Sequence, residues 1–195
     1  MTFDERKLTP SFGYVFQSKW LDPQESIVSM LWKFALMNAL SGHVIVRQLA
    51  TAGIDPYEGV EARRAEVDMR RLRGALGLRL NLVRSALIPD SLRKITSPHF
   101  RFCAKCLCRG YHCVVHQLDT VHQCPIHGAW LQAACPRCGQ PAPYRLNARL
   151  LDAPFRCAGC RSFYGLGPPK FLKRRQLVQK ERAAVTRLKL HYYSS

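Results

Sequence analysis

The chain has 195 residues, 47% of them hydrophobic, which is enough to bury the core of one large or two small domains. With 30 lysines and arginines against 13 acids, the formal charge is +17. A charge of this size favours a polyanionic partner such as nucleic acid. No apolar run reaches the length of a membrane span, and no secretory signal is visible, so we expect a cytoplasmic protein that does not enter membranes.

The positive charge is unevenly distributed along the chain. Residues 1–100 carry 14 basic and 10 acidic residues, residues 101–168 carry 8 and 2, and residues 169–195 carry 8 and 1. The acid-poor parts have the electrostatic pattern of a nucleic-acid-binding surface, although a solvated basic face would show it too. We therefore expect three parts, a helical domain over 1–98, a double zinc-binding domain over 99–168 and a basic tail over 169–195.

The first part predicts a mainly α fold. Capping residues and apolar periodicity predict helices over 23–40, 43–52, 58–76 and 80–87, the first of them started by Asp22. The helix over 23–40 is apolar nearly all round, so we expect it at the centre of the core. The same property would permit a homodimer face.

The last two predicted helices meet at Gly77, which allows a sharp turn. A helix, a glycine turn and a second helix outline a helix-turn-helix unit, in which Arg79 and Arg84 would face nucleic acid. Helices that meet at a glycine are also common in purely structural cores, so both interpretations stay open. Residues 91–102 are expected to form a linker to the next part.

Four pairs of metal-ligand residues, each with two residues between them, follow in the motifs CAKC, CPIH, CPRC and CAGC. Two such turns complete a tetrahedral site, and gaps of 17 and 18 residues between paired turns are typical of structural zinc. Dithiol exchange is the alternative for one pair, but four tandem pairs disfavour it. The sequence thus predicts two closed zinc fingers or ribbons, one held by Cys103, Cys106, Cys124 and His127 and the other by Cys135, Cys138, Cys157 and Cys160.

Further residues of ligand type lie in the same region, namely Cys108, Cys113, His112, His116 and His122. We expect supporting or packing roles for His112 and His116 and buried positions for the two thiols. Four protein ligands leave no open position on a metal, and the sequence has no P-loop, zinc-deaminase or serine-hydrolase motif, so we expect no enzyme. An HNH-like nuclease that uses His112 and His116 is the remaining enzymatic alternative.

A Gly/Pro-rich break precedes residues 170–190, which predict a basic helix with a ragged apolar stripe. We expect this tail to fold only on a partner. Basic side chains of the zinc region and the tail would contact phosphate groups: Arg109, Arg137, Arg161, Lys170, Lys173, Arg174 and Arg175.

The run RFCAKCLCRGYHCVVHQLDTVHQCPIHGAWLQAACPRCG resembles the TniQ family of transposon target-selection proteins, which includes TnsD. The likeness lies in the residues between the ligands, GYH and HQL, as much as in CPIHG and CPRC. The run PQESIVSMLWKFALMN is similar to the family's opening helix, with Met30 where the family usually has Trp. The resemblance covers about residues 20–165.

The resemblance implies a non-enzymatic adaptor that marks where a transposon inserts. Family members join a target-recognition module to a AAA+ ATPase regulator of the TnsC type, and thereby act on target DNA and indirectly on the transposase. Short members lack the C-terminal domains of TnsD, and some work with a CRISPR effector and its guide RNA. This chain resembles the short kind, which would be nucleoid-associated when active. The alternative is a standalone zinc-containing helix-turn-helix DNA-binding regulator.

Overall fold

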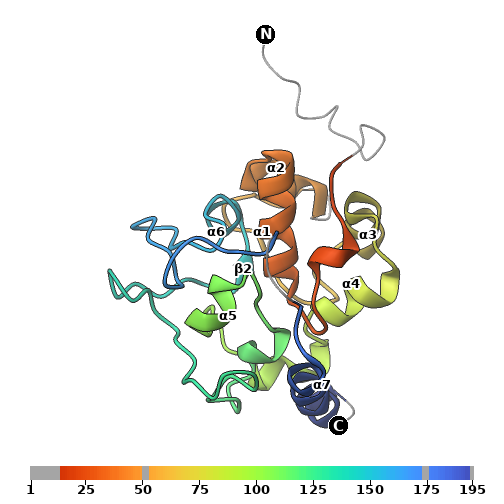
Figure 1. The fold of residues 1–195 in the computed structure, drawn as a ribbon. Coiled ribbons are helices and arrows are strands. Elements are labelled where there is room, and N and C mark those ends of the chain that lie inside the picture. The colour runs from red at the N-terminus through yellow and green to blue at the C-terminus, as the bar shows by residue number, and fades with distance from the viewer. Residues whose placement is uncertain (1–13, 50–52, 173–175, 194–195) are drawn as a thin grey trace.

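Helix α1 (Ile27–Asn38) is the central element of the fold, as Figure 1 shows. Its residues from Ile27 to Ala35 are all buried, which confirms the expected core helix. Ser26 caps the start, because its Oγ accepts a hydrogen bond from Ser29 N at 3.3 Å. The structure is a computed structural model and describes residues 14–49, 53–172 and 176–193.

The expected helix start at Asp22 is wrong. Gln24 has a φ of 62°, which no α-helix can pass through. Glu25 is fully buried and forms an ion pair with Lys33 of α1. Lys33 Nζ also donates to Trp20 O at 2.8 Å. The buried pair is tolerated because both charges are matched and further hydrogen-bonded.

Three longer helices and one short helix lie around α1 or beside one another: α2 (Gly42–Leu49), α3 (Met69–Leu76), α4 (Leu80–Ala86) and α6 (Ala148–Leu151). The most extensive contacts join α2 to α6, α3 to α4 and α2 to α3. Helix α2 confirms the second predicted helix within the described residues, and α4 confirms the fourth. The described part of the chain is thus mostly helical.

The third predicted helix is shorter than expected, since of residues 58–76 only α3 is an α-helix. Asp68 starts it, because its Oδ1 accepts from the amides of Arg70 and Arg71, both at 3.0 Å. The residues before it form turns and strand β1 (Val60–Glu61), which pairs antiparallel with β2 (Arg145–Leu146). The acidic cap at the helix start therefore outweighs the Arg-rich run that precedes it.

The expected linker over 91–102 is also wrong, because this segment is part of the core. Phe100 and Phe102 are 1% and 0% exposed, and their rings stack with centroids 5.5 Å apart. Phe102 exchanges backbone hydrogen bonds with Gln132, each 2.8 Å long. Short helical turns complete the described elements: η3 (Ser18–Trp20), η4 (Asp90–Ile95), α5 (Ala104–Cys108) and η5 (Val114–Gln117).

Helix α7 (Gln179–Tyr193) packs against the rest of the chain, contrary to the expectation that the tail folds only on a partner. Val185 is fully buried. Lys189 Nζ donates to Gln24 Oε1 at 2.6 Å and to Ser85 O at 2.9 Å. Leu188, Tyr192 and Tyr193 also pack against the core, so α7 docks through a few apolar side chains and the stem of Lys189.

One hydrophobic core joins residues from all three expected parts of the chain. Trp32 of α1 donates its indole N–H to Leu150 O at 2.8 Å, and its ring lies against Phe100 and Phe155. The contacts of the core therefore cross both boundaries expected from the charge distribution. No helix in the described residues is both long enough and apolar enough to cross a membrane.

Candidate metal centres

The predicted ligands gather into two separate clusters, each with four ligand atoms within 4.8 Å of one another. They are the two sets that the spacing predicts. Cluster 1 comprises Cys103, Cys106, Cys124 and His127, and cluster 2 comprises Cys135, Cys138, Cys157 and Cys160.

The donor geometry of cluster 1 fits a zinc ion. His127 Nδ1 lies 3.5, 3.3 and 3.6 Å from the sulfurs of Cys103, Cys106 and Cys124. The sulfurs of Cys106 and Cys124 are 3.5 Å apart. In a tetrahedral site with Zn–S bonds of about 2.3 Å, neighbouring ligand atoms lie roughly 3.5 to 3.8 Å apart. One imidazole and three thiolates therefore surround a point that zinc would fill.

Cluster 2 fits in the same way with sulfur alone. The sulfurs of Cys135 and Cys160 lie 3.6 Å apart, and those of Cys138 and Cys157 lie 3.7 Å apart. Four thiolates are a common donor set for structural zinc. Both sets would leave the metal without an open position, so it would hold loops together and would not activate water.

The clusters differ in their contact with solvent. The three cysteines of cluster 1 are buried, whereas Cys138 of cluster 2 is exposed. Burial raises the pKa of Cys106, while hydrogen bonds from neighbouring thiols lower the pKa of Cys103, so the crowded sulfurs compete for protons. A bound zinc would displace these protons, because its ligands bind in deprotonated form.

Three of the four ligand turns share one backbone pattern. The amide four residues after the first ligand donates to the carbonyl of that ligand, at 2.8 Å after Cys124 and at 2.9 Å after both Cys135 and Cys157. The amide of each first ligand donates to the carbonyl five residues later, at 2.8 to 2.9 Å. The turn at Cys103 differs, because it leads directly into α5.

His112 connects the ligand region to α1. Its Nε2–H donates to Arg101 O at 2.7 Å, so its Nδ1 accepts from the hydroxyl of Ser26 at 2.6 Å. Burial lowers the pKa of His112 from 6.5 to about 4. The imidazole is thus a buried neutral link to the residue that caps α1, which agrees with the expected supporting role.

The other ligand-type residues lie outside both clusters. His116 is fully buried, and neither of its ring nitrogens has a hydrogen-bond partner among the described residues. Burial lowers its pKa well below the usual range. Cys113 is buried as expected, but Cys108 is only half-buried, and His122 is exposed. The histidine pair therefore packs without joining a metal cluster.

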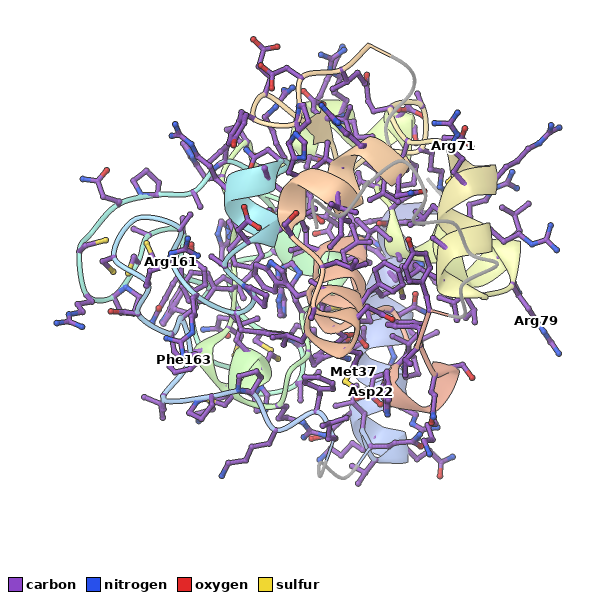
Figure 2. All side chains as sticks on the ribbon, turned by 90° about the horizontal axis from the view of Figure 1, so that it is seen from above. Asp22, Met37, Arg71, Arg79, Arg161 and Phe163 are labelled. Atoms are coloured by element: carbon purple, nitrogen blue, oxygen red, sulfur yellow. The ribbon has the colours of Figure 1, made fainter. Side chains whose placement is uncertain are left out.

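The helix pair α3–α4 presents an arginine-rich face. Gly77 has a φ of 61° and ends α3, and α4 begins after two further residues. Arg79 and Arg84 are both exposed, as are Arg70, Arg71 and Arg73 of α3. Figure 2 shows Arg71 and Arg79 pointing outward on the same side of the molecule.

The remaining predicted phosphate contacts are scattered. Arg109 is about three-quarters buried and its Nη1 lies 3.5 Å from Glu181 Oε1 of α7, so it holds the tail. Arg137, Arg161 and Lys170 are exposed. Lys173, Arg174 and Arg175 lie outside the described residues.

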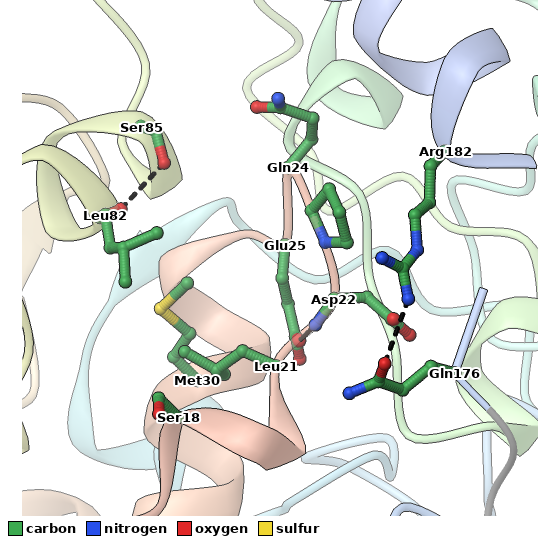
Figure 3. A pocket seen from close by; sticks show the side chains of 11 residues that line it. Ser18, Leu21, Asp22, Gln24, Glu25, Met30, Leu82, Ser85, Gln176 and Arg182 are labelled. Carbon is green, nitrogen blue, oxygen red and sulfur yellow. Dashed lines mark hydrogen bonds between the residues drawn. The ribbon is translucent and has the colours of Figure 1, made fainter. Parts of the chain in front are cut away.

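A pocket of about 350 Å³ lies where the segment before α1 meets α4 and the start of α7 (Figure 3). Leu177 N donates to Asp22 Oδ1 at 3.1 Å, and Arg182 Nη2 donates to Gln176 Oε1 at 2.9 Å. The buried Glu25 also lines it. Sequence reasoning missed this junction, because its partners are more than 150 residues apart along the chain.

No protein-family model matches the chain, and a search of curated proteins finds no significant match.

Proposed function

We propose that the chain is a non-enzymatic target-selection adaptor of a transposon, which links a DNA-targeting module to a AAA+ regulator of the TnsC type. The supporting observation is the arrangement of the segment that carries the TniQ resemblance. The predicted ligands form two clusters of four. Residues 111–118, which lie between Cys106 and Cys124 of cluster 1, are all buried. The inter-ligand residues thus belong to the framework of this fold, and closed metal sites would shape a surface without reacting.

The surfaces around this framework suit polyanionic partners. The α3–α4 face carries exposed arginines, and the region of cluster 2 adds Arg137 and Arg161. In the proposal these surfaces contact target DNA and, where the targeting module is a CRISPR effector, its guide RNA. The module could equally be a protein bound at an attachment site, and contact with the transposase would be indirect.

A standalone DNA-binding regulator is the second candidate, and the helix pair favours it. The left-handed Gly77 separates α3 from α4, and α4 exposes Arg84 on the surface. This candidate predicts operator binding without an ATPase, and Arg84→Ala would relax its sequence preference. Binding that ignores sequence and falls with salt would instead favour the adaptor.

The nuclease alternative loses support from burial. His112 and His116 are each 0% exposed, and both nitrogens of His112 are engaged by Arg101 and Ser26. A general base must reach the proton that it abstracts. Magnesium-dependent nicking by the pure protein, lost in His112→Ala, would be needed to revive this alternative.

A reconstitution experiment tests the adaptor. The zinc-loaded chain is mixed at low salt with target DNA and a TnsC-type ATPase from the same transposon, and co-retention is measured. We expect a ternary complex that the Cys106→Ser variant fails to form, because it lacks a ligand of cluster 1. No association of the intact chain with the ATPase on DNA would contradict the proposal.

A further inference from the structure

Two guanidinium groups, those of Arg137 and Arg156, lie on the short segment that follows the last ligand of cluster 2, and a third arginine, Arg161, belongs to that segment. Arg137 Nη1 donates to Ser162 Oγ at 3.2 Å. Arg156 Nη1 donates to the carbonyl of Arg161 at 2.9 Å, and its guanidinium lies 3.5 Å from the ring centroid of Phe163. We call Arg137, Arg156 and Arg161 the arginine cluster. Their side chains are held in place by neutral groups.

The members of this cluster form hydrogen bonds with neutral groups, and no acidic residue of the described chain forms an ion pair with them. Arg161 Nη1 donates to the backbone carbonyl of Asp152 at 2.8 Å, whereas Asp152 Oδ1 accepts from Gly42 N at 2.6 Å. Three preoriented guanidiniums without carboxylates suit an anionic ligand.

The backbone at Arg161 indicates that its side chain is used. In the turns that begin at Cys124 and Cys135, the fourth residue after the first ligand is glycine, with φ of 61° for Gly128 and 72° for Gly139. The equivalent residue after Cys157 is Arg161, which has the same left-handed backbone with φ of 61°. Glycine takes this conformation without steric cost, but arginine does not. The chain bears that cost in one turn of three, at an exposed arginine whose guanidinium is held by the carbonyl of Asp152.

The chemistry of the cluster fits phosphates better than bases. The guanidinium of Arg156 covers one face of the Phe163 ring, so a base cannot stack on that face. Arginines that contact phosphate groups position the nucleic acid and carry no sequence information directly.

The arginine cluster also lies away from the helix pair. In Figure 2, Arg161 and Phe163 lie on one side of the molecule, and Arg71 and Arg79 lie on the opposite side. In Figure 1 the loops of cluster 2 and the pair α3–α4 are separated in the same direction, with α1 between them. A single straight duplex on one face would not reach both.

We propose that the arginine cluster is a second, sequence-independent phosphate-binding surface for duplex DNA, so that the protein bridges two nucleic-acid segments from opposite faces. The inference rests on the nucleic-acid binding in the proposed function and extends it. The helix pair would engage one segment, while the turn of cluster 2 holds the backbone of another.

The equivalence of the turns supplies a variant that separates binding from folding. Arg161→Gly restores the residue that the other two turns carry, so we expect full zinc content and an unchanged or higher melting temperature. The double variant Arg137→Gln/Arg161→Gly should bind a duplex of unrelated sequence about tenfold more weakly. The slope of its log affinity against log salt concentration should be shallower by about two. Fluorescence anisotropy between about 50 and 200 mM salt measures both quantities.

A charge-matched control keeps the test specific. Lys19→Gln with Arg187→Gln removes two exposed positive charges from η3 and α7, and should change affinity far less. Bridging is tested by capture of a labelled duplex on an immobilised duplex, which the intact chain should support. The variant Arg137→Gln/Arg161→Gly should still bind single duplexes but should no longer capture the second duplex. Equal losses in the cluster variant and the control would overturn the inference but leave the proposed function standing. No DNA binding by the intact chain would overturn both.

Discussion

His112 shows how a single side chain ties the ligand region to the helical core. Its neutral tautomer donates to Arg101 O and accepts from Ser26, while Ser26 in turn accepts from Ser29 N at the start of α1. Each polar atom in this relay has a partner, which a fully buried polar group requires. A proton added to Nδ1 would remove the acceptor that the Ser26 hydroxyl needs.

The relay predicts a loss of stability in mild acid. Because burial lowers the pKa of His112 from 6.5 to about 4, the unfolded chain takes up a proton in this window that the folded chain does not. The free energy of unfolding should therefore fall by about 2 kcal/mol from His112 alone between pH 7 and pH 5. Urea unfolding at each pH, with zinc content verified, measures this. The matched variant His112→Gln retains a donor for Arg101 O and should show a shallower slope, and identical slopes would count against the relay.

The role of a residue could be predicted where it depends on neighbours in the sequence, and could not where it depends on contacts with distant segments. The eight ligands could be assigned from spacing, because a two-residue gap fixes a turn whatever the rest of the chain does. The burial of Glu25 with Lys33 could not, since it depends on Gln24 turning the chain just before α1. The half-buried position of Cys108 likewise involves a distant segment, because its sulfur accepts a hydrogen bond from Leu166 N at 2.9 Å.

At the scale of elements, α7 is the clearest case of tertiary packing outweighing sequence pattern. Its weak apolar stripe predicts an unfolded tail, yet Val185 is fully buried and Glu181 and Lys189 contact distant segments. Helices 43–52 and 80–87 were predictable, because a helix-ending residue, Gly53 or Pro89, follows each helical segment. The helix over 58–76 was not, because the cap at Asp68 decides its start.

The docking of α7 can be tested with two substitutions on the same helix. Val185→Asp places a charge in the core and should destabilise the docked helix by about 3 kcal/mol. Hydrogen exchange should then show fast exchange across residues 179–193. Ala183→Asp adds the same charge at an exposed position and should leave the exchange unchanged. Fast exchange of α7 in the unsubstituted protein would contradict its docking.

For the whole molecule, the two ligand clusters and the helices share one core. Phe100, Phe102 and Tyr164 pack together beside the ligand region, and Trp32 joins them to α1. The three parts that the charge distribution distinguishes therefore differ in surface charge, but residues of all three contribute to one hydrophobic core. Zinc bound at the two clusters would therefore contribute to the stability of the fold, because each cluster joins loops that carry core residues.

The assignment of the two clusters as zinc sites is tested most directly by metal analysis of freshly prepared reduced protein. We predict about two zinc ions per chain, one of them lost in Cys106→Ser and the other in Cys138→Ser, with chelation unfolding the region after Phe102. A zinc content near zero in reduced protein that remains folded would contradict the assignment of the two clusters as zinc sites.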